Sequence, residues 1–552
     1  MDERKAQEMI HRAASENLAW LDRLPSRKKE ILEKVNGEVD PVTAVCENGN
    51  FNITGPAVIP AKKQPGLRWL RPAMAMCAAL VLIAGVWTIR RSGQVGQFAQ
   101  PDVVTEPAGR ETPAADPERT SLPAAVIVPE AEKSGMPLDR IDLYADPAAL
   151  WNNENGLLAE GDNVIKKTGQ LPFQNTVYRK AYDQGISTEG ELVYRDEQGN
   201  ELFRDRISLQ LGGDDYSLDM PQKSFLVKAL DGAFEHRVFD DRTADSFPSL
   251  LLRNSGNDCL FTRVADGLQH RLIEKYTDIR VMTLAWRPVQ VYLNDEYWGM
   301  YNIREDEDGH AVCRYEQVSD DLAENVIIVS ISGAAYQGSG AEFRGMRKTV
   351  SQSHPAENPE DLAYLEQEID IDRFLDWLAA EMYFGNPDIG TGRFYRLPGG
   401  KWKCMLRDLD YGLYNSEYNS VQEYLKEDGM GVQGIDNSIF RKILEVGKYR
   451  ELFLTKLGNL YKSLTTEAMQ AELDRMAEWI EPGMKEHLER WAPYNDGKII
   501  TEVPSDPEEA WNYWKRRIDR MKNTMSKRPG LLYRYVQEFF GLDDAEMAVY
   551  FE

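Results

Sequence analysis

One uncharged stretch divides the chain into a short N-terminal segment and a much longer C-terminal one. Residues 73–89 form a run of 17 residues without a charge, and arginines bound this run on both sides. As a helix that rises ~1.5 Å per residue it spans about 26 Å, close to the thickness of the hydrocarbon core of a bilayer. We therefore expect a transmembrane helix over residues 72–91; a helix buried in a folded core is the alternative.

Basic residues are distributed unevenly around this run. Lys62, Lys63, Arg68 and Arg71 precede it, whereas Arg90 and Arg91 follow it. Because positive residues are retained on the cytoplasmic side, we expect residues 1–71 in the cytoplasm and the large C-terminal part outside it. Residues 92–137 are rich in Pro, Ala, Glu and Thr, a composition typical of a disordered linker. The folded domain is expected over residues 138–552.

The charge and the cysteines limit the partners that the chain can have. The formal net charge is −25 at pH 7, and nucleic acids and anionic lipids bind basic patches, so no nucleic acid is expected as a partner. None of the five cysteines lies in a C-x-x-C pair or in a His/Cys pattern typical of a zinc site. We expect buried, unreactive thiols, and a disulfide among Cys259, Cys313 and Cys404 is left open for an exported domain.

Alternation of apolar and polar residues predicts strands in the first half of the folded domain. Turn residues at 198–200 and at 294–295 each join two such segments, which is the pattern of a hairpin. A further strand over 207–211 ends at Gly212-Gly213, and a strand with lysine follows over 223–228. Strand, glycine loop and lysine strand is the order of parts that covers the phosphates of ATP in kinases; a plain hairpin is the alternative.

Helical patterns dominate the second half. Apolar residues between 371 and 385 recur at i, i+3, i+4 and i+7, which predicts an amphipathic helix. Helical periodicity then continues from residue 438 to the end of the chain. A β-rich part, a mixed part and an all-helical part in this order predict an α+β fold with two lobes and a helical C-terminal part.

Two carboxylate motifs come after the predicted helix. Asn386-Pro387-Asp388 lies in the loop that follows it, and Asp408-Leu409-Asp410 follows a predicted hairpin over 393–406. Kinases use one carboxylate to accept the proton of the attacking hydroxyl and a later one to hold magnesium. Solvated turns also carry such residues, so the spacing alone leaves both interpretations open.

Further segments lie in the order found in the CotH family of spore-coat-type kinases, which the chain resembles. They are 221–224, 252–258, 291–301, Glu305, 386–388, Trp402 and 408–410, and together they cover roughly residues 138–540. The resemblance implies an atypical two-lobed protein-kinase-like domain. Such a domain uses ATP and Mg²⁺ to phosphorylate Ser or Thr of a protein substrate in the envelope or spore coat.

The resemblance implies roles for single acidic residues. Asp388 matches the catalytic aspartate and Asp408 the magnesium-binding aspartate, with Asp410 close enough to assist. Arg253 and Asp258 match a strong family motif, and a buried ion pair that holds the lobes together is the favoured interpretation.

The resemblance also implies a set of nucleotide contacts. Lys223 or Lys228 would contact phosphate, and Glu305 would be the acidic partner of that lysine. Trp402 matches an aromatic residue that lies beside the nucleotide.

Two positions depart from the family pattern. Family members often carry an Asn after the catalytic aspartate, near the place of Gly392 and Arg393, and a carboxamide can bind metal whereas an arginine cannot. The family also tends to have an Arg just before residues 221–224, where this chain has Leu218. Both differences weaken the metal and phosphate apparatus, although Arg393 could contact phosphate directly. A catalytically weak, pseudokinase-like surface module that binds protein or glycan is therefore the alternative function.

Overall fold

The computed structural model describes residues 43–47, 50–54, 138–152, 156–159, 164–167, 176–179, 182, 184–213, 218, 220–426, 436–495 and 502–552. The chain divides into two compact units, Met1–Pro117 and Glu118–Glu552. In the first unit the structure describes a hairpin of β1 (Thr43–Glu47) and β2 (Asn50–Thr54). The predicted membrane span over 72–91 and the predicted linker over 92–137 lie outside the described residues.

Within the described residues, no helix combines the length and the apolar character that crossing a membrane requires.

The second unit begins with a closed barrel in the strand order β10-β11-β9-β8-β7-β6-β3. β3 pairs with β10 in parallel, and the other neighbours pair antiparallel. The strands are β3 (Arg140–Ala145), β6 (Ser187–Arg195), β7 (Glu201–Gly212), β8 (Ser224–Ala229), β9 (Ser249–Arg253), β10 (Trp286–Leu293) and β11 (Glu296–Glu305). Between β3 and β6 in the chain are α4 (Pro147–Trp151) and the hairpin of β4 (Val164–Lys167) and β5 (Thr176–Arg179).

Both hairpins predicted from turn residues are confirmed. β6 and β7 pair with Tyr194 opposite Phe203, and the predicted strand over 207–211 is the second half of β7. β10 and β11 meet at Asn294 and Asp295, whose φ angles of 49° and 67° are those that a tight hairpin turn requires. The apolar side chains of these strands fill the barrel interior, which explains their period of two in the sequence.

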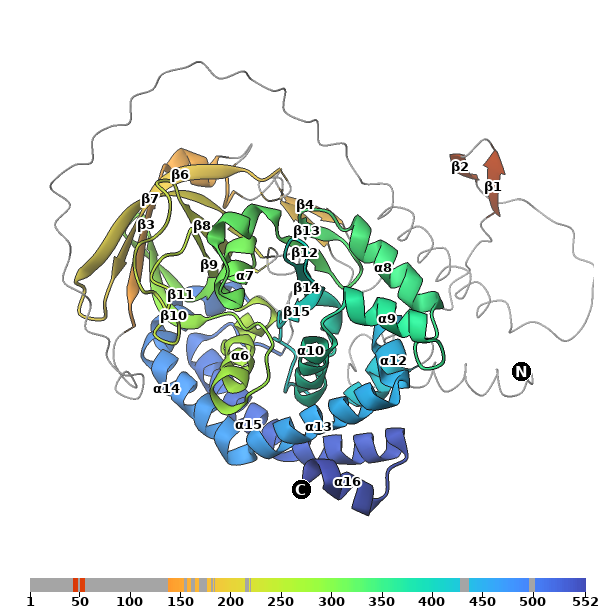
Figure 1. The fold of residues 1–552 in the computed structure, drawn as a ribbon. Helices are drawn as coiled ribbons and strands as arrows, with labels where there is room; N and C mark the ends of the chain where they lie inside the picture. Colours follow the sequence, from red (N-terminus) through yellow and green to blue (C-terminus); the bar gives the residue numbers. More distant parts are fainter. Residues whose placement is uncertain are drawn as a thin grey trace, which may run out of the picture. The chain divides into compact units, whose positions relative to one another are not determined.

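Another sheet lies beside the barrel, in the order β13-β12-β14-β15 (Figure 1). Its strands are β12 (Ile327–Ser330), β13 (Ala335–Gln337), β14 (Arg393–Arg396) and β15 (Lys403–Met405), so the hairpin predicted over 393–406 is confirmed. The predicted amphipathic helix is α10 (Ile371–Phe384), which packs against β15. Other elements of this part are η3 (Gly256–Leu260), α6 (Ala265–Tyr276), α7 (Gly309–Glu316), η4 (Asp320–Asn325), α8 (Ala341–Gln352), α9 (Pro359–Glu368), η5 (Ile389–Thr391) and α11 (Ser420–Leu425).

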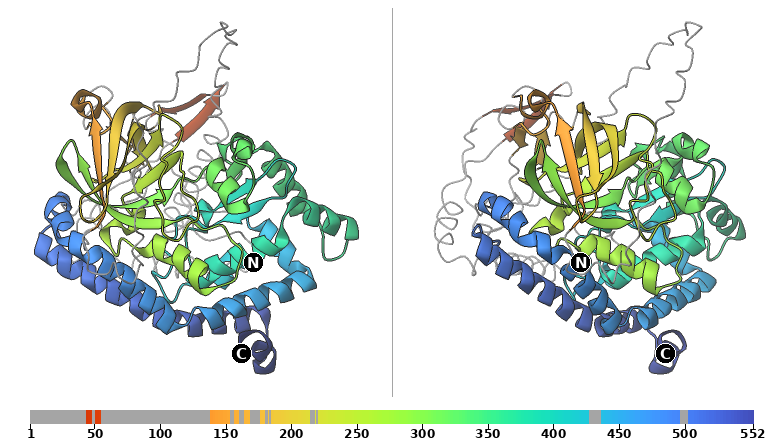
Figure 2. Two further views of the ribbon diagram at one scale, coloured as in Figure 1. Left: turned by 60° about the vertical axis from the view of Figure 1, so that its left-hand side comes forward. Right: turned by 90° about the vertical axis from the view of Figure 1, so that its left-hand side faces the viewer.

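The C-terminal part is helical, as predicted. It contains α12 (Ser438–Glu445), α13 (Gly447–Ser463), α14 (Thr466–Trp491), η7 (Ala492–Tyr494), α15 (Pro507–Phe540) and α16 (Asp544–Phe551). Figure 2 shows the two long helices, α14 and α15, running along one side of the rest of the unit. α14 packs against β11 of the barrel and α15 packs against α10 and α11, so this pair braces the barrel and the helical core together. The second unit is thus a mixed α/β structure.

The cysteines of the second unit are unpaired. Cys313 and Cys404 are buried, Cys259 is partly buried, and no disulfide joins these three residues. Burial raises the pKa of the Cys259 thiol to about 12 and that of the Cys404 thiol as well, so both are held in the unreactive thiol form.

Candidate active site

A cavity of about 480 Å³ opens where the barrel meets the loop after β15. This volume is within the range of roughly 300–1,000 Å³ that is common for small-molecule sites. Gly212 and Gly213 from the end of β7, Lys228 from β8 and Arg253 from the end of β9 line its barrel side. The predicted glycine loop and the lysine strand therefore do border a cavity.

Charged side chains make up much of the lining. Among the described residues, seven acidic and five basic side chains contribute: Asp266, Glu305, Asp306, Glu307, Asp308, Asp408 and Asp410, and Lys228, Arg253, Arg304, Arg393 and Arg407. The cavity therefore has an acidic excess, which repels a polyanion unless cations enter with it.

Asp408 is the third residue after the end of β15 and has an uncommon backbone conformation. Its φ is 57°, in the left-handed region, which aspartate adopts more readily than most residues. Its carboxylate accepts a hydrogen bond from Nη2 of Arg253 at 3.0 Å and one from Nη1 of Arg407 at 3.3 Å. The left-handed conformation of Asp408 costs about 1–2 kcal/mol relative to the right-handed one, and the hydrogen bonds from the two arginines to its carboxylate stabilise it.

Arg253 joins the end of β9 to the loop after β15. Its Nη1 and Nη2 donate to Oδ1 and Oδ2 of Asp410 at 3.0 and 2.9 Å, and Oδ2 also accepts from the backbone N–H of Asn257 at 2.7 Å. The burial of Asp410 is nearly complete, with 1% of its side chain exposed. This bidentate pair is one of the polar connections between the barrel and the loop after β15.

The predicted pair between Arg253 and Asp258 is wrong. The carboxylate of Asp258 accepts from the backbone N–H groups of Thr262 and Ala265, both at 2.9 Å, and from the Thr262 hydroxyl. Ser255, with φ of 81°, and Gly256, with φ of 54°, turn the chain between the two motif residues, and the Arg253 guanidinium binds Asp408 and Asp410 instead. Asp258 instead satisfies free N–H groups at the start of α6.

Asp388 lies in the loop that follows α10. Gly385, with φ of 66°, ends the helix, and Asn386 is buried behind the loop. The amide of Asn386 accepts from the N–H of Asp388 at 3.1 Å and donates to Glu381 at 3.0 Å. Asp388 itself is partly exposed and does not line the cavity.

A buried glutamate lies near the predicted catalytic aspartate and the predicted magnesium ligand Asp408. Burial, with smaller contributions from the charges of Asp388 and Asp408, raises the pKa of Glu381 to about 8. Both aspartates are therefore within electrostatic range of the same carboxyl group, although 20 residues of chain separate them. The structure thus brings Asp388 and Asp408 to the same region.

Arg528, from α15, fixes the loop that carries Asp388. Its guanidinium donates to the carbonyls of Met382 at 2.6 Å and Tyr383 at 3.0 Å, and to the hydroxyl of Ser420 at 2.6 Å. These carbonyls lie in the last turn of α10, where the helix has no following N–H groups that could donate to them. Burial lowers the pKa of Arg528 to about 10, but at neutral pH the side chain stays charged.

Two of the predicted nucleotide contacts do not reach the cavity. Nζ of Lys223 is buried and donates to the carbonyls of Leu218, at 2.8 Å, and Met220. Trp402 is fully buried, with its ring centroid 4.9 Å from that of Phe343. Leu218, where the family tends to have arginine, belongs to the apolar core of the barrel.

Lys228 and Glu305 both line the cavity, yet the structure pairs Glu305 with arginines. Arg242 donates to its Oε2 at 3.2 Å, Arg314 lies 3.5 Å from its Oε1, and the N–H of Ala285 donates to Oε2 at 3.0 Å. Among the described residues, no ion pair joins Lys228 to Glu305. The predicted lysine–glutamate pair is therefore not formed in this conformation.

Arg393 forms part of the cavity wall. Its guanidinium stacks on the ring of Tyr336 at 3.3 Å and lies 3.6 Å from the carboxylate of Glu307. Arg407 binds the same carboxylate at 2.7 and 3.0 Å. Two arginines thus share one glutamate close to Asp408.

Sequence reasoning missed Arg407 and Glu381. Arg407 directly precedes Asp408, and this adjacency was the available signal. Glu381 lies within the otherwise apolar last turns of α10, and a carboxylate at a core position of a predicted helix could have marked it as a candidate site residue.

The carboxylates of Asp408 and Asp410 have the chemistry of magnesium ligands, because Mg²⁺ prefers carboxylate oxygens. In the conformation described, Arg253 and Arg407 hold these oxygens. Among the described residues, no group of three or more His, Cys, Asp or Glu side chains is arranged to hold a metal ion. The donor set fits magnesium, and the arginine contacts must rearrange for it to bind.

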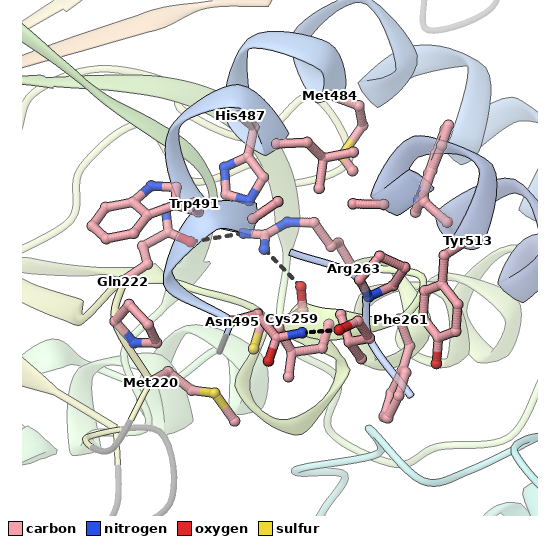
Figure 3. A pocket seen from close by; sticks show the side chains of 18 residues that line it. Met220, Gln222, Cys259, Phe261, Arg263, Met484, His487, Trp491, Asn495 and Tyr513 are labelled. Atoms are coloured by element: carbon pink, nitrogen blue, oxygen red, sulfur yellow. Dashed lines mark hydrogen bonds between the residues drawn. The ribbon is translucent and has the colours of Figure 1, made fainter. Parts of the chain in front are cut away.

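Figure 3 shows a different pocket, of about 60 Å³, between α14, α15 and residues 220–222. Arg263 crosses it and donates to the side chain of Gln222 at 3.0 Å and to the carbonyls of Cys259 at 2.9 Å and Met300 at 3.0 Å. This pocket is small and its central cation is satisfied by the protein, so we assign it a structural role.

The family model described as CotH kinase protein matches residues 209–532. This range runs from β7 into α15 and contains Lys228, Arg253, Glu305, Asp388, Asp408 and Asp410. No curated protein matches the chain. Because the family model covers more than half of the 552 residues, the chain belongs to the CotH kinase protein family.

Proposed function

We propose that the chain is an ATP- and magnesium-dependent protein kinase that phosphorylates Ser or Thr of an envelope or spore-coat-type protein. The observation that carries the proposal is that Asp408 lines a cavity of nucleotide size and that Asp388 lies within electrostatic range of the same buried Glu381. Phosphoryl transfer needs two carboxylates of different roles in one region, one for the metal and one for the attacking hydroxyl.

The charge of the cavity supports a metal-bound nucleotide. Acidic side chains outnumber basic ones in its lining, so the phosphates of ATP gain little from the protein alone. When bound, magnesium would neutralise phosphate charge and orient the transferred group. Asp408 and Asp410 would hold it, once their oxygens exchange arginine for metal.

The remaining roles follow from position. Lys228 would contact phosphate from the barrel side of the cavity, which the glycines at the end of β7 also line. Asp388 would accept a hydrogen bond from the acceptor hydroxyl and take its proton during transfer. Its partial exposure suits this role, because a protein substrate has to reach it from outside.

Membrane attachment is a further part of the proposal. The uncharged run over 73–89, with more basic residues before it than after it, supports a single-pass anchor over 72–91 with residues 1–71 in the cytoplasm. The kinase domain would then lie outside the cytoplasm, joined to the anchor by residues 92–137.

A catalytically weak module that binds protein or glycan is the second candidate. Two observations favour it: Asp408 and Asp410 are engaged by arginines, and Arg393 stands where the family often has Asn. The expected location outside the cytoplasm, where ATP is scarce, also favours it.

Calorimetry of the full chain with ATP, with and without Mg²⁺, separates the two candidates when it is combined with phosphate transfer to a generic acceptor protein. A kinase binds ATP more tightly with Mg²⁺, and Asp408→Asn weakens this metal-dependent binding. The change in unfolding free energy should be small, because Arg253 and Arg407 each keep another carboxylate partner, Asp410 and Glu307. Metal-independent binding, or no transfer with any divalent metal, supports the module instead.

A further inference from the structure

Glu305 lines the active-site cavity and also a second, separate cavity. This cavity has a volume of about 310 Å³ and is lined by residues around α6 and α7. Among its described lining residues, three arginines face two glutamates: Arg242, Arg280 and Arg314, and Glu274 and Glu305. Arg280 also pairs with Asp372, which does not line the cavity, so the anion preference of this cavity depends on Arg242 and Arg314.

Arg314 is the least satisfied of these arginines. It lies in the last turn of α7, with 20% of its side chain exposed. Among the described residues its guanidinium makes no hydrogen bond: Glu305 is 3.5 Å away and the buried Nε has no partner. A mostly buried guanidinium with unmade hydrogen bonds is costly, and an acceptor placed in the cavity would satisfy it.

Arg242 is the second guanidinium at the same carboxylate. Its Nε donates to Glu305 at 3.2 Å and its Nη1 donates to Glu274, whereas the contacts of its Nη2 to Thr283 are long, at 3.3 and 3.5 Å. The hydroxyl-bearing residues Thr277 and Thr283 line the cavity too. Two guanidinium groups with neighbouring hydroxyls match the oxygens of a phosphate group, which guanidinium binds in a bidentate way.

We propose that this cavity binds a phosphate group through Arg314 and Arg242. The group is either inorganic phosphate or the monoester of a phosphorylated Ser or Thr side chain, which present the same oxygens. Bound phosphate competes with Glu305 for the two arginines. Phosphate binding to this cavity does not depend on the kinase activity proposed above. An effect of the released Glu305 on Lys228, and through it on nucleotide binding, rests on that proposed function.

Arg314 also has an ordinary structural role, which the test must separate from ligand binding. A cation in the last turn of a helix is favourable, and its guanidinium lies over the ring of Phe247 at 5.0 Å. Arg490 offers a matched control. It lies in the last turn of α14, with 22% of its side chain exposed, over the ring of Trp298 at 4.4 Å and with an unpartnered Nε. It does not line the cavity.

The experiment is calorimetry of the full chain with inorganic phosphate and with phosphoserine, at constant ionic strength and without nucleotide or divalent metal. We expect Arg314→Gln to weaken binding about tenfold or more, since it removes charge-assisted hydrogen bonds. Glu305→Gln should tighten binding because the competing charge is gone, and Arg490→Gln should bind as the wild type does.

The two variants move affinity in opposite directions, which general loss of folding cannot imitate. Absence of binding to the wild type, equal binding by Arg314→Gln, or weaker binding by Glu305→Gln would each overturn the proposal. Tighter binding of phosphoserine than of phosphate identifies a phosphorylated protein as the source of the ligand, and the reverse order identifies free phosphate. Because no nucleotide is present, the result stands whether or not the chain transfers phosphate.

Discussion

Arg253 and Asp410 form a bidentate ion pair, with both N–H···O distances near 3 Å, that links the barrel to the loop after β15. The two residues lie 157 positions apart in the chain. The same arginine reaches Asp408, so the contact that joins the two parts also occupies the predicted magnesium ligands. Stability and metal binding are thereby connected through one side chain.

Arg253→Gln should destabilise the domain by about 3–5 kcal/mol, because it leaves the buried carboxylate of Asp410 without its charge partner. Urea unfolding measures this free energy. Arg206→Gln is the control, since Arg206 and Glu189 form an exposed pair on the barrel, with 62% and 74% of their side chains exposed, and such pairs are worth about 1 kcal/mol or less. Equal small effects of both variants would mean that the Arg253 pair contributes little to holding the domain together.

Glu381 predicts a specific dependence of stability on pH. Burial raises its folded-state pKa to about 8, above the ordinary 4.5, so the unfolded chain releases this proton at lower pH than the folded chain does. The contribution of Glu381 is therefore fully present below pH 4.5 and is lost as pH rises towards 8, by up to about 1.4 kcal/mol per pH unit.

Glu381→Gln removes this titration and keeps an acceptor for Asn386. Urea unfolding of wild type and variant at pH 5, 6.5 and 8 should show the variant gaining stability relative to the wild type as pH rises. A difference between the two proteins that stays constant over this range would mean that Glu381 is ionised in the folded state at all three pH values.

The sequence predicted well those features that neighbouring residues determine. The turn at Asn294 and Asp295 and the alternation in β7 depend on local backbone preferences, and the helix over 371–384 depends on a local apolar period. The loop positions of Asp388 and Asp408 follow from these elements, so they too could be predicted.

The partners of the charged residues could not be predicted in this way. Arg253 forms an ion pair with Asp410, which is distant in the sequence, and Glu305 pairs with Arg242 and Arg314 and not with Lys228. Tertiary packing determines which charged side chains come together, so the local sequence does not reveal these pairs. Trp402 illustrates the same limit, since a ring in a core and a ring beside a ligand have the same local pattern.

Arg393→Asn tests the departure from the family pattern. The guanidinium adds positive charge near Asp408, which disfavours a divalent cation, whereas a carboxamide can be a metal ligand. We expect the variant to need less Mg²⁺ for half-maximal ATP binding, measured by calorimetry over a range of Mg²⁺ concentrations. A higher requirement, together with weaker ATP binding, would show that Arg393 contacts phosphate instead.

Asp388 is the residue on which the kinase proposal depends. Asp388→Ala should lower phosphate transfer by about 10²-fold or more if the carboxylate acts as general base. ATP binding should be retained, because Asp388 does not line the cavity.

Asp372→Ala is the control for this prediction. Asp372 lies in the first turn of α10 with 40% of its side chain exposed, and it pairs with Arg280 and Lys456. Loss of transfer in both variants would point to a disturbed α10, and full transfer by Asp388→Ala would remove this carboxylate from the chemistry. If the wild type transfers no phosphate with any metal and Arg393→Asn restores none, the binding module replaces the kinase as the function of this fold.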